Sequence, residues 1–155
     1  MNRLHPRVRL LWIARALITA AVLSGIVLAV RLAVAPPWLP PWAPAAVFAG
    51  LAILGVGGAV LRYRVWRYEI REDSLYLERG VLTRVRTVVP FVRVQHVDTS
   101  RSPTERAIGL ASTVVYTAGS RGADVSVPGL APDDADDLRE RLKRLAIRSE
   151  GEDAV

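Results

Sequence analysis

His96 and Asp98 are the side chains best placed for acid–base chemistry in this sequence. They stand two positions apart in an extended segment, so both project from one face of a strand and a His–Asp contact is expected. A general base of this kind also needs a nucleophile and an orienting group. The sequence has no cysteine and no Gly-x-Ser-x-Gly motif, which favours a structural or binding role for His96 over catalysis.

Metal and cofactor sites have few residues to draw on. The absence of cysteine excludes thiolate zinc sites and iron–sulfur clusters, and His5 and His96 are 91 positions apart. The acidic cluster at 133–137 lacks the glycine and the distal glutamate of a calcium-binding loop. The glycines at 55–58 have no strand before them and no Lys-Ser/Thr after them, unlike a phosphate loop. We therefore expect no metal and no cofactor.

A second kind of chemistry, attraction of anions, is suggested by arginines on the outward faces of neighbouring predicted strands. These residues are Arg67, Arg71, Arg84 and Arg86. One hypothesis is a surface for anionic lipid or a partner close to the bilayer. The alternative is a solvated face paired across strands with Glu69 and Glu78. The interleaved acids nearly neutralise the patch and favour the alternative.

Charge and hydropathy divide the chain into two parts. Residues 1–64 contain seven arginines and no acid, whereas residues 65–155 contain 14 basic and 15 acidic residues. The net charge of +6 therefore belongs to the half that also holds the long apolar runs. This distribution is typical of a membrane protein flanked by arginine rather than of a nucleic-acid-binding surface, so no nucleic-acid partner is expected.

Two apolar segments, at about 10–34 and 42–61, are long enough to cross a hydrocarbon core of ~30 Å. Four prolines in 35–41 cannot continue a helix, so a transmembrane hairpin over 1–62 is expected to bind membrane lipid. A cleaved signal peptide, or two buried helices of a soluble domain, are the alternatives. Arginines before the first span and after the second, against a loop uncharged beyond Arg31, predict that both termini are cytoplasmic.

Smaller features accompany these spans. Trp12 and Trp66 are expected near the inner interface and Trp38 and Trp42 near the outer one, with core packing as the alternative for Trp66. Small residues recur at four-residue spacing within each span and would allow the helices to approach closely, with chance spacing in an alanine-rich chain as the alternative. They are Ala21, Gly25, Ala29, Ala46, Gly50, Gly55 and Ala59.

From residue 63 to 147 the pattern predicts six or seven short antiparallel strands and then one helix. Residues 91–97 are expected to be extended, a short helix is expected from Pro103 to Gly109, and Pro128-Gly129 is expected to break the sheet. The last helix, about 132–146, carries one apolar stripe. The stripe consists of Ala135, Leu138, Leu142 and Leu145. The expected fold is α+β, a bent antiparallel sheet or barrel capped by this helix, with a polar tail at 148–155.

The segment from Val89 to Asp98, followed by Arg106–Ala111, Thr117-Ala118-Gly119 and Val127–Leu130, resembles the YdbS-like family of prokaryotic pleckstrin-homology (PH) proteins. The resemblance covers about residues 5–147. Its motif positions include Pro90, Arg93, Gln95, His96, Gly109 and Gly119. The resemblance implies a PH-like fold behind a two-helix membrane anchor, and it carries no catalytic activity onto these residues.

Eukaryotic PH domains often bind phosphoinositides through basic residues between their first two strands, but here that loop is Glu72-Asp73-Ser74. Two carboxylates there repel a phosphorylated headgroup. We therefore expect a non-enzymatic interaction module at the inner membrane face that docks a protein partner or another copy of the chain. The alternative is an anionic lipid-headgroup domain. Arg93 and Gln95 are expected to hydrogen-bond the sheet to the short helix at 103–108.

Overall fold

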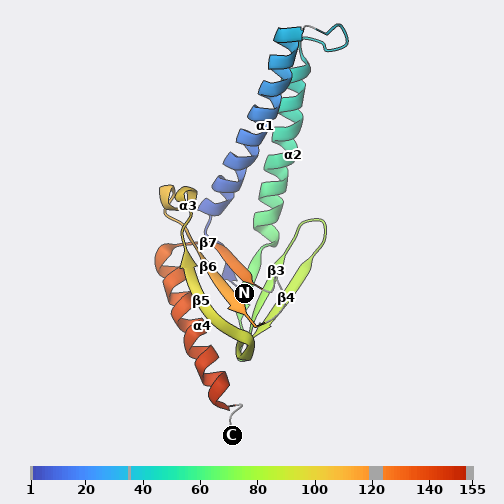
Figure 1. Cartoon of the computed structure of the whole chain (residues 1–155). Coiled ribbons are helices and arrows are strands. Elements are labelled where there is room, and N and C mark those ends of the chain that lie inside the picture. Colours follow the sequence, from blue (N-terminus) through green and yellow to red (C-terminus); the bar gives the residue numbers. More distant parts are fainter. Residues whose placement is uncertain (1, 35, 119–123, 153–155) are drawn as a thin grey trace. The chain divides into compact units, whose positions relative to one another are not determined.

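The computed structural model describes residues 2–34, 36–118 and 124–152 (Figure 1). They form two compact units, one made of residues 9–64 and the other of residues 2–8 together with 65–152. The elements, in chain order, are β1 (Asn2–Arg3), α1 (Arg7–Val34), α2 (Ala43–Val65), β2 (Arg67–Ile70), β3 (Ser74–Arg79), β4 (Val85–Pro90), η1 (Phe91–Arg93), β5 (Val94–Ser100), α3 (Pro103–Ala107), β6 (Ala111–Thr117), β7 (Val125–Leu130) and α4 (Pro132–Glu152).

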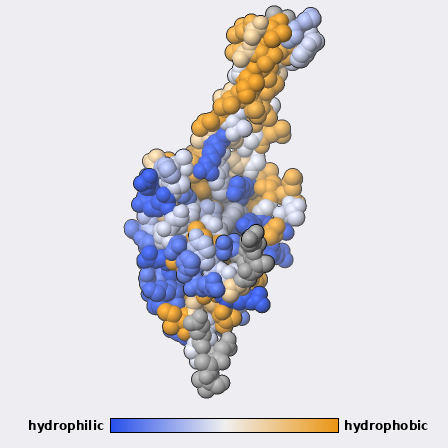
Figure 2. All heavy atoms as spheres, in the orientation of Figure 1, coloured by the Kyte–Doolittle hydropathy of each residue, from blue (hydrophilic) through white to orange (hydrophobic). Residues whose placement is uncertain are grey.

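The unit of residues 9–64 is a helical hairpin. Helices α1 and α2 are long and apolar enough to cross a membrane, and little of either is buried. Figure 2 shows the hydrophobic colour along both helices. Their close approach is at Gly55, where an added Cβ would lie 2.7 Å from the Cβ of Ala16, whereas Gly25 and Gly50 have open space beside them. Gly55 therefore packs against the facing helix as predicted, whereas Gly25 and Gly50 do not, although Ser24 Oγ donates to the Pro44 carbonyl at 2.7 Å.

The second unit contains two antiparallel sheets. Sheet A has the strand order β1-β2-β3-β4, and sheet B has the order β5-β6-β7. The 3-10 turn η1 joins them, and α4 follows the last strand. This is the predicted α+β, PH-like arrangement, with two open sheets in place of a closed barrel.

The core of this unit combines side chains from both sheets and α4. Leu75 and Leu77 of β3, Phe91 of η1 and Leu142 of α4 are fully buried. Helix α4 packs on β5, β6 and η1, and the buried Thr113 Oγ1 donates a hydrogen bond to the Ala135 carbonyl at 3.1 Å. The predicted stripe is confirmed: Ala135, Leu138 and Leu142 are buried and Leu145 is half-buried.

Three local predictions were wrong. The last helix was expected to end near residue 146 before a polar tail, but α4 continues to Glu152. Residues 91–97 are not uniformly extended, because Phe91–Arg93 form a 3-10 turn that starts after Pro90 and buries Phe91. The chain leaves sheet A and enters sheet B at this turn. Pro128-Gly129 does not break the sheet either, since β7 continues to Leu130. Gly129 has φ +65, a conformation open to glycine at little cost, and the register shifts nearby between Ala111 and Thr113.

Residues 2–8 belong to the PH-like unit and not to the hairpin. The sequence placed them with the hairpin, whereas Asn2 and Arg3 pair with Tyr68 and Arg67 as strand β1. The His5 N–H donates to the Gly129 carbonyl at 2.8 Å. Trp66 is buried in this unit's core, which is the packing alternative rather than the interfacial one.

Candidate functional site

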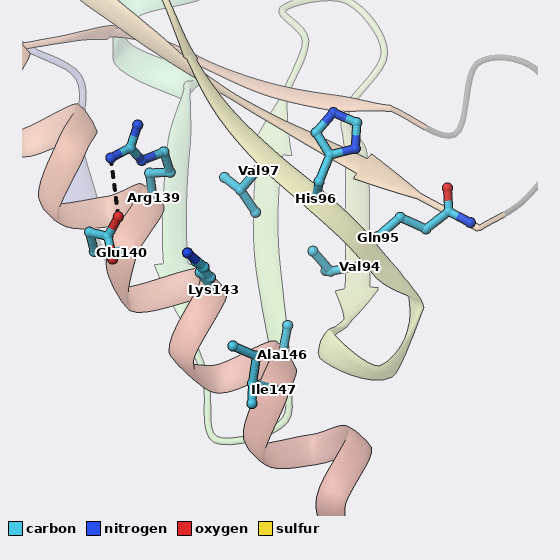
Figure 3. Close-up of a pocket in the computed structure, with 9 residues that line it drawn as sticks. All are labelled: Val94, Gln95, His96, Val97, Arg139, Glu140, Lys143, Ala146 and Ile147. Atoms are coloured by element: carbon cyan, nitrogen blue, oxygen red, sulfur yellow. Dashed lines mark hydrogen bonds and ion pairs between the residues drawn. The ribbon is translucent and has the colours of Figure 1, made fainter.

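A groove lies between strand β5 and helix α4, with a volume of about 490 Å³ (Figure 3). The strand contributes Val94, Gln95, His96 and Val97, and the helix contributes Arg139, Glu140, Lys143, Ala146 and Ile147. Strand β5 is an edge of sheet B, with β6 on its inner side and, in the part of the chain that the structure describes, no strand on its outer side. One row of β5 backbone donors and acceptors is therefore open beside the groove.

The groove is lined by both apolar and polar residues, and its α4 rim carries the charged residues Arg139, Glu140 and Lys143. Val94 and Ala146 are buried, whereas Ile147 is exposed. Arg139 Nη2 is paired with Glu140 Oε1 at 3.1 Å. Lys143, one helical turn after Arg139, makes no ion pair with any described residue. The rim therefore offers an ammonium group that no described residue holds in an ion pair.

The side chains on the two faces of β5 make different contacts. Val97 and Thr99 stand opposite Val115 and Thr113 of β6, and Thr99 Oγ1 donates to Asp136 Oδ1 of α4 at 2.9 Å. His96 projects from the other face, where its ring stacks on Tyr116 at 4.2 Å between centroids.

The predicted contact between His96 and Asp98 is present. His96 Nε2 lies 3.4 Å from Asp98 Oδ2, and both side chains are more than half exposed. This pair therefore lies at the surface and not in an enclosed pocket. Stacking and a carboxylate contact both hold the imidazole in place.

The four predicted arginines do not converge. Arg71 Nε lies 3.5 Å from Glu69 Oε2, and the Arg71 guanidinium also covers the Tyr76 ring at 4.3 Å. Arg86 Nε lies 3.7 Å from Glu78 Oε1. Arg67 stands opposite Glu78 in the ladder, and Arg84 is exposed in the loop between β3 and β4. The cross-strand pairing that the sequence offered as an alternative is present for Arg86 with Glu78, whereas Arg71 and Glu69 are two positions apart in one segment.

The remaining motif positions are mainly placed at turns. Pro90 precedes η1, the Arg93 carbonyl accepts the Ala118 N–H at 2.8 Å, and Gly109 follows α3. Gly119 lies outside the described residues. Gln95 lines the groove beside α4, and its expected link with Arg93 to the short helix stays a prediction.

Helix α3 begins with a well-formed cap. The Ser102 side chain accepts the Glu105 N–H at 3.3 Å, and Glu105 Oε2 accepts the Ser102 N–H at 2.9 Å. Glu105 Oε1 also accepts a hydrogen bond from Ser112 of β6 at 2.6 Å. This capping box confirms the predicted short helix and fixes it to sheet B.

The acidic start of α4 is not assembled into a metal site. No group of three or more potential ligands is brought together among the residues described. Asp134 instead lies close enough to act on Tyr68 of β2. Burial raises the pKa of the Tyr68 phenol, a hydrogen bond with the Asn2 side chain opposes this, and the Asp134 charge adds to the increase.

The sequence did not predict the groove. Gln95 is 48 positions before Lys143 and 52 before Ile147, and no local motif joins the strand residue to the two helix residues. A signal existed in part, because Arg139, Lys143 and Ile147 repeat at four-residue spacing along one side of α4. What lies opposite that side depends on which strand forms the sheet edge.

Comparison with known proteins gives a family and a relative. The family model described as "Bacterial PH domain" matches residues 8–146. The UPF0699 transmembrane protein YdbS of Bacillus subtilis (strain 168) is 41% identical over 86 residues, which are 56% of this chain and 52% of that protein. The match thus spans about half the length of this relative. No solved structure matches the chain significantly.

Proposed function

Because the chain belongs to the bacterial PH domain family, we propose that it is a membrane-anchored module whose PH-like unit docks an extended, acidic segment of a protein partner. Its membrane location rests on the two candidate spans and on the transmembrane relative. The observation that carries the docking proposal is the open edge of β5 beside the groove with α4.

The open edge supports binding of an extended chain rather than of a compact ligand. An added strand would satisfy the exposed N–H and C=O groups of β5 through ladder hydrogen bonds. Alternate side chains of that strand would point toward α4, where Val94, Val97 and Ala146 supply apolar contacts. Backbone pairing gives affinity in this mode, and the side-chain contacts give selectivity.

Lys143 supports an acidic side chain in the partner segment. Its ammonium stands at the rim without a carboxylate partner among the described residues, whereas the neighbouring Arg139 is paired with Glu140. A partner carboxylate at this point would form an ion pair at the edge of an apolar contact. Such rim pairs improve the rate of association and the choice of partner more than the final affinity.

A binding role also agrees with the surroundings of His96. Its contacts are Asp98 and Tyr116, and neither is a nucleophile activated by a base. The arginines of sheet A support a headgroup-specific lipid site less well than the groove supports docking, because Arg71 and Arg86 each have a carboxylate neighbour.

The groove should face the cytoplasm. Arg3 precedes α1, and Arg7 and Arg9 lie in its first turn. Arg62 and Arg64 lie in the last turn of α2, and Arg67 begins β2, whereas the loop at 36–41 has no charge. Positively charged flanks are retained on the cytoplasmic side. A reporter that works only in the cytoplasm should therefore be active when fused after residue 155. A reporter that works only outside the membrane should be active when inserted at 36–41. The reverse pattern would contradict this topology.

The docking proposal can be tested with displayed peptides and full-length protein in nanodiscs. Selection should enrich extended peptides with β-branched residues and an acid. Lys143→Glu should weaken a selected peptide by roughly 1–2 kcal/mol, about 5- to 30-fold, since it replaces an attraction by a repulsion. Arg144→Glu is the matched control, because it makes the same charge change at an exposed neighbour that does not line the groove.

A photo-crosslinker at Gln95 provides the positional readout. It should capture the selected peptide, and Lys143→Glu should reduce the yield. Equal losses in the Lys143 and Arg144 variants would show that binding responds only to overall charge, and the groove would not be the site. Capture of a second copy of the chain in place of peptide would indicate self-assembly.

A further inference from the structure

The loop between β3 and β4 carries an apolar tip flanked by arginine. Leu82 is 100% exposed, and Val81 and Val85 are also exposed. Arg79 ends β3 and Arg84 precedes β4. From residue 79 to residue 97 the sequence contains four arginines and no acidic residue. A single exposed leucine is ordinary on a protein surface. Here, however, three exposed apolar residues at the tip of a hairpin are flanked by arginines, and this combination favours an environment that is both apolar and anionic.

The loop has a defined shape. Gly80 has φ +98, and an added Cβ would lie 2.0 Å from the Thr83 carbonyl oxygen. Only a residue without a Cβ fits such a turn without strain. Arg79 pairs with Val85 across the base of the hairpin. The apolar tip is therefore presented by a constrained turn and does not fold back onto the sheet.

The flanking arginines differ from those of the sheet. Arg86 has Glu78 beside it at 3.7 Å. Arg79 and Arg84 are exposed, and no carboxylate of a described residue forms an ion pair with either. Arg79 was absent from the residues selected by sequence, because its importance depends on its position at the base of the loop.

Chain connectivity ties this loop to the end of the membrane helix. Strand β2 begins at Arg67, two residues after α2 ends at Val65. The ladder register sets Arg67 opposite Glu78 and Glu78 opposite Arg86. The loop that follows Glu78 therefore leaves sheet A at the same end as the chain enters it from α2. Adjacent strands are only about 5 Å apart.

We propose that the β3–β4 loop is a membrane contact, with Leu82 and Val81 inserted among the acyl chains and Arg79 and Arg84 at the lipid phosphates. The bilayer is the fitting occupant because the tip combines apolar and cationic groups and leaves sheet A at the end where the chain enters from α2. This contact would orient the PH-like unit at the surface, while the hairpin supplies the anchor. It is independent of the docking groove.

The test uses full-length protein reconstituted in vesicles of phosphatidylglycerol and phosphatidylethanolamine, with no peptide present. The natural chain has no cysteine, so Thr83→Cys can carry a single polarity-sensitive fluorophore while Leu82 is kept. Ile147→Cys is the matched control, since Ile147 is an exposed apolar residue on α4. Lipids with a quencher on the acyl chain report insertion.

The label at residue 83 should be quenched and blue-shifted, and the label at residue 147 should not. Adding Leu82→Ser to the Thr83→Cys protein should reduce the quenching. Arg79→Gln and Arg84→Gln should each lower the ratio of inserted to withdrawn loop by about fivefold, the factor corresponding to ~1 kcal/mol per basic residue near an acidic leaflet. In phosphatidylcholine vesicles the arginine variants should lose this effect.

Equal quenching at residues 83 and 147, or quenching that Leu82→Ser leaves unchanged, would overturn the proposal. A blue shift that appears only at high protein-to-lipid ratio, without quenching by lipid, would indicate contact between copies and would overturn it as well. Because no peptide is present, failure here leaves the docking proposal intact, and failure of peptide selection leaves this one intact.

Discussion

Ile53 in the hairpin and Leu142 in the PH-like unit are similar side chains in opposite surroundings. Ile53 is 72% exposed, whereas Leu142 is 0% exposed. In α1 and α2 the apolar residues occupy all sides of the helix, and in α4 they form one stripe backed by charged residues. A helix that is apolar all around must be surrounded by other apolar material, which for this family member is lipid.

The comparison teaches that burial and hydropathy carry different information. In the PH-like unit, an apolar residue stabilises the fold by leaving water for a packed core. In the hairpin, lipid tails are as apolar as leucine, so side-chain packing between helices depends on close contact instead. The same substitution should therefore have different consequences in the two units.

The largest effect is expected from Leu142→Asp. Removing a buried leucine costs about 2–5 kcal/mol, and an unpaired buried charge adds further cost, so the sum approaches the whole stability of a small domain. Hydrogen exchange of β6 and β7 in detergent-solubilised full-length protein should show loss of protection. Ile147→Asp, on the same helix but 61% exposed, should retain protection. Equal protection in both variants would mean that α4 is not packed on the sheet.

Ile53→Asp should show the opposite pattern. A carboxylate near the middle of a span costs roughly 2.5–3.5 kcal/mol during insertion, so alkaline extraction should release a larger fraction of the protein from membranes. Hydrogen exchange of β6 and β7 should remain as in the natural chain. Loss of protection in the PH-like unit without a change in insertion would contradict the assignment of Ile53 to a lipid-facing surface.

Gly55→Ala should have a smaller effect within the hairpin. The new Cβ would lie 2.7 Å from the Ala16 Cβ, and overpacking of this kind typically costs about 1–3 kcal/mol. Gly57→Ala is the control, since nothing lies within 4 Å of the position of its added Cβ. Engineered disulfides between α1 and α2 should form more slowly in the Gly55 variant alone. Equal rates would show that the helices do not meet there.

The smallest effect concerns Tyr68 of the PH-like unit. Its pKa is raised above the ordinary value of 10.0 chiefly by burial, so the folded state holds the phenolic proton more tightly than the unfolded state. The resulting stabilisation is complete below pH 10 and is lost as the pH rises further. Raising the pH to about 11 should therefore lower the Tm of the natural chain more than the Tm of Tyr68→Phe, as measured by thermal melts. Equal decreases in the Tm of the two proteins would exclude Tyr68 as the cause of the pH dependence.

Much of the architecture could be predicted from local pattern. Span length and the proline-rich loop indicated the hairpin, alternation indicated the strands, and Pro103 with Gly109 indicated the short helix α3. These features depend on residues a few positions apart. The turn at Phe91 was missed because an extended pattern does not reveal where a chain passes from one sheet to another. The continuation of β7 through Gly129 was missed because its turn signal was outweighed by pairing across the sheet.

The candidate sites were predicted less completely. The contact of His96 with Asp98 follows from a two-residue spacing, and the pairing of Arg86 with Glu78 follows from neighbouring strands. The groove required knowledge that β5 is an edge and that α4 lies beside it. The role proposed for Arg79 required the register of β3 and β4.

By itself, the sequence determined the helices and most of the strands, which helices suit lipid, and the distribution of charge along the chain, because these depend on hydropathic period and on short-range chemistry. Tertiary structure alone decided that residues 2–8 join the C-terminal unit, that Trp66 enters its core, and that β5 keeps an open edge beside α4. Each of these depends on pairing between segments far apart in the chain. Many pairings satisfy the same local pattern, and packing of the whole unit selects one of them.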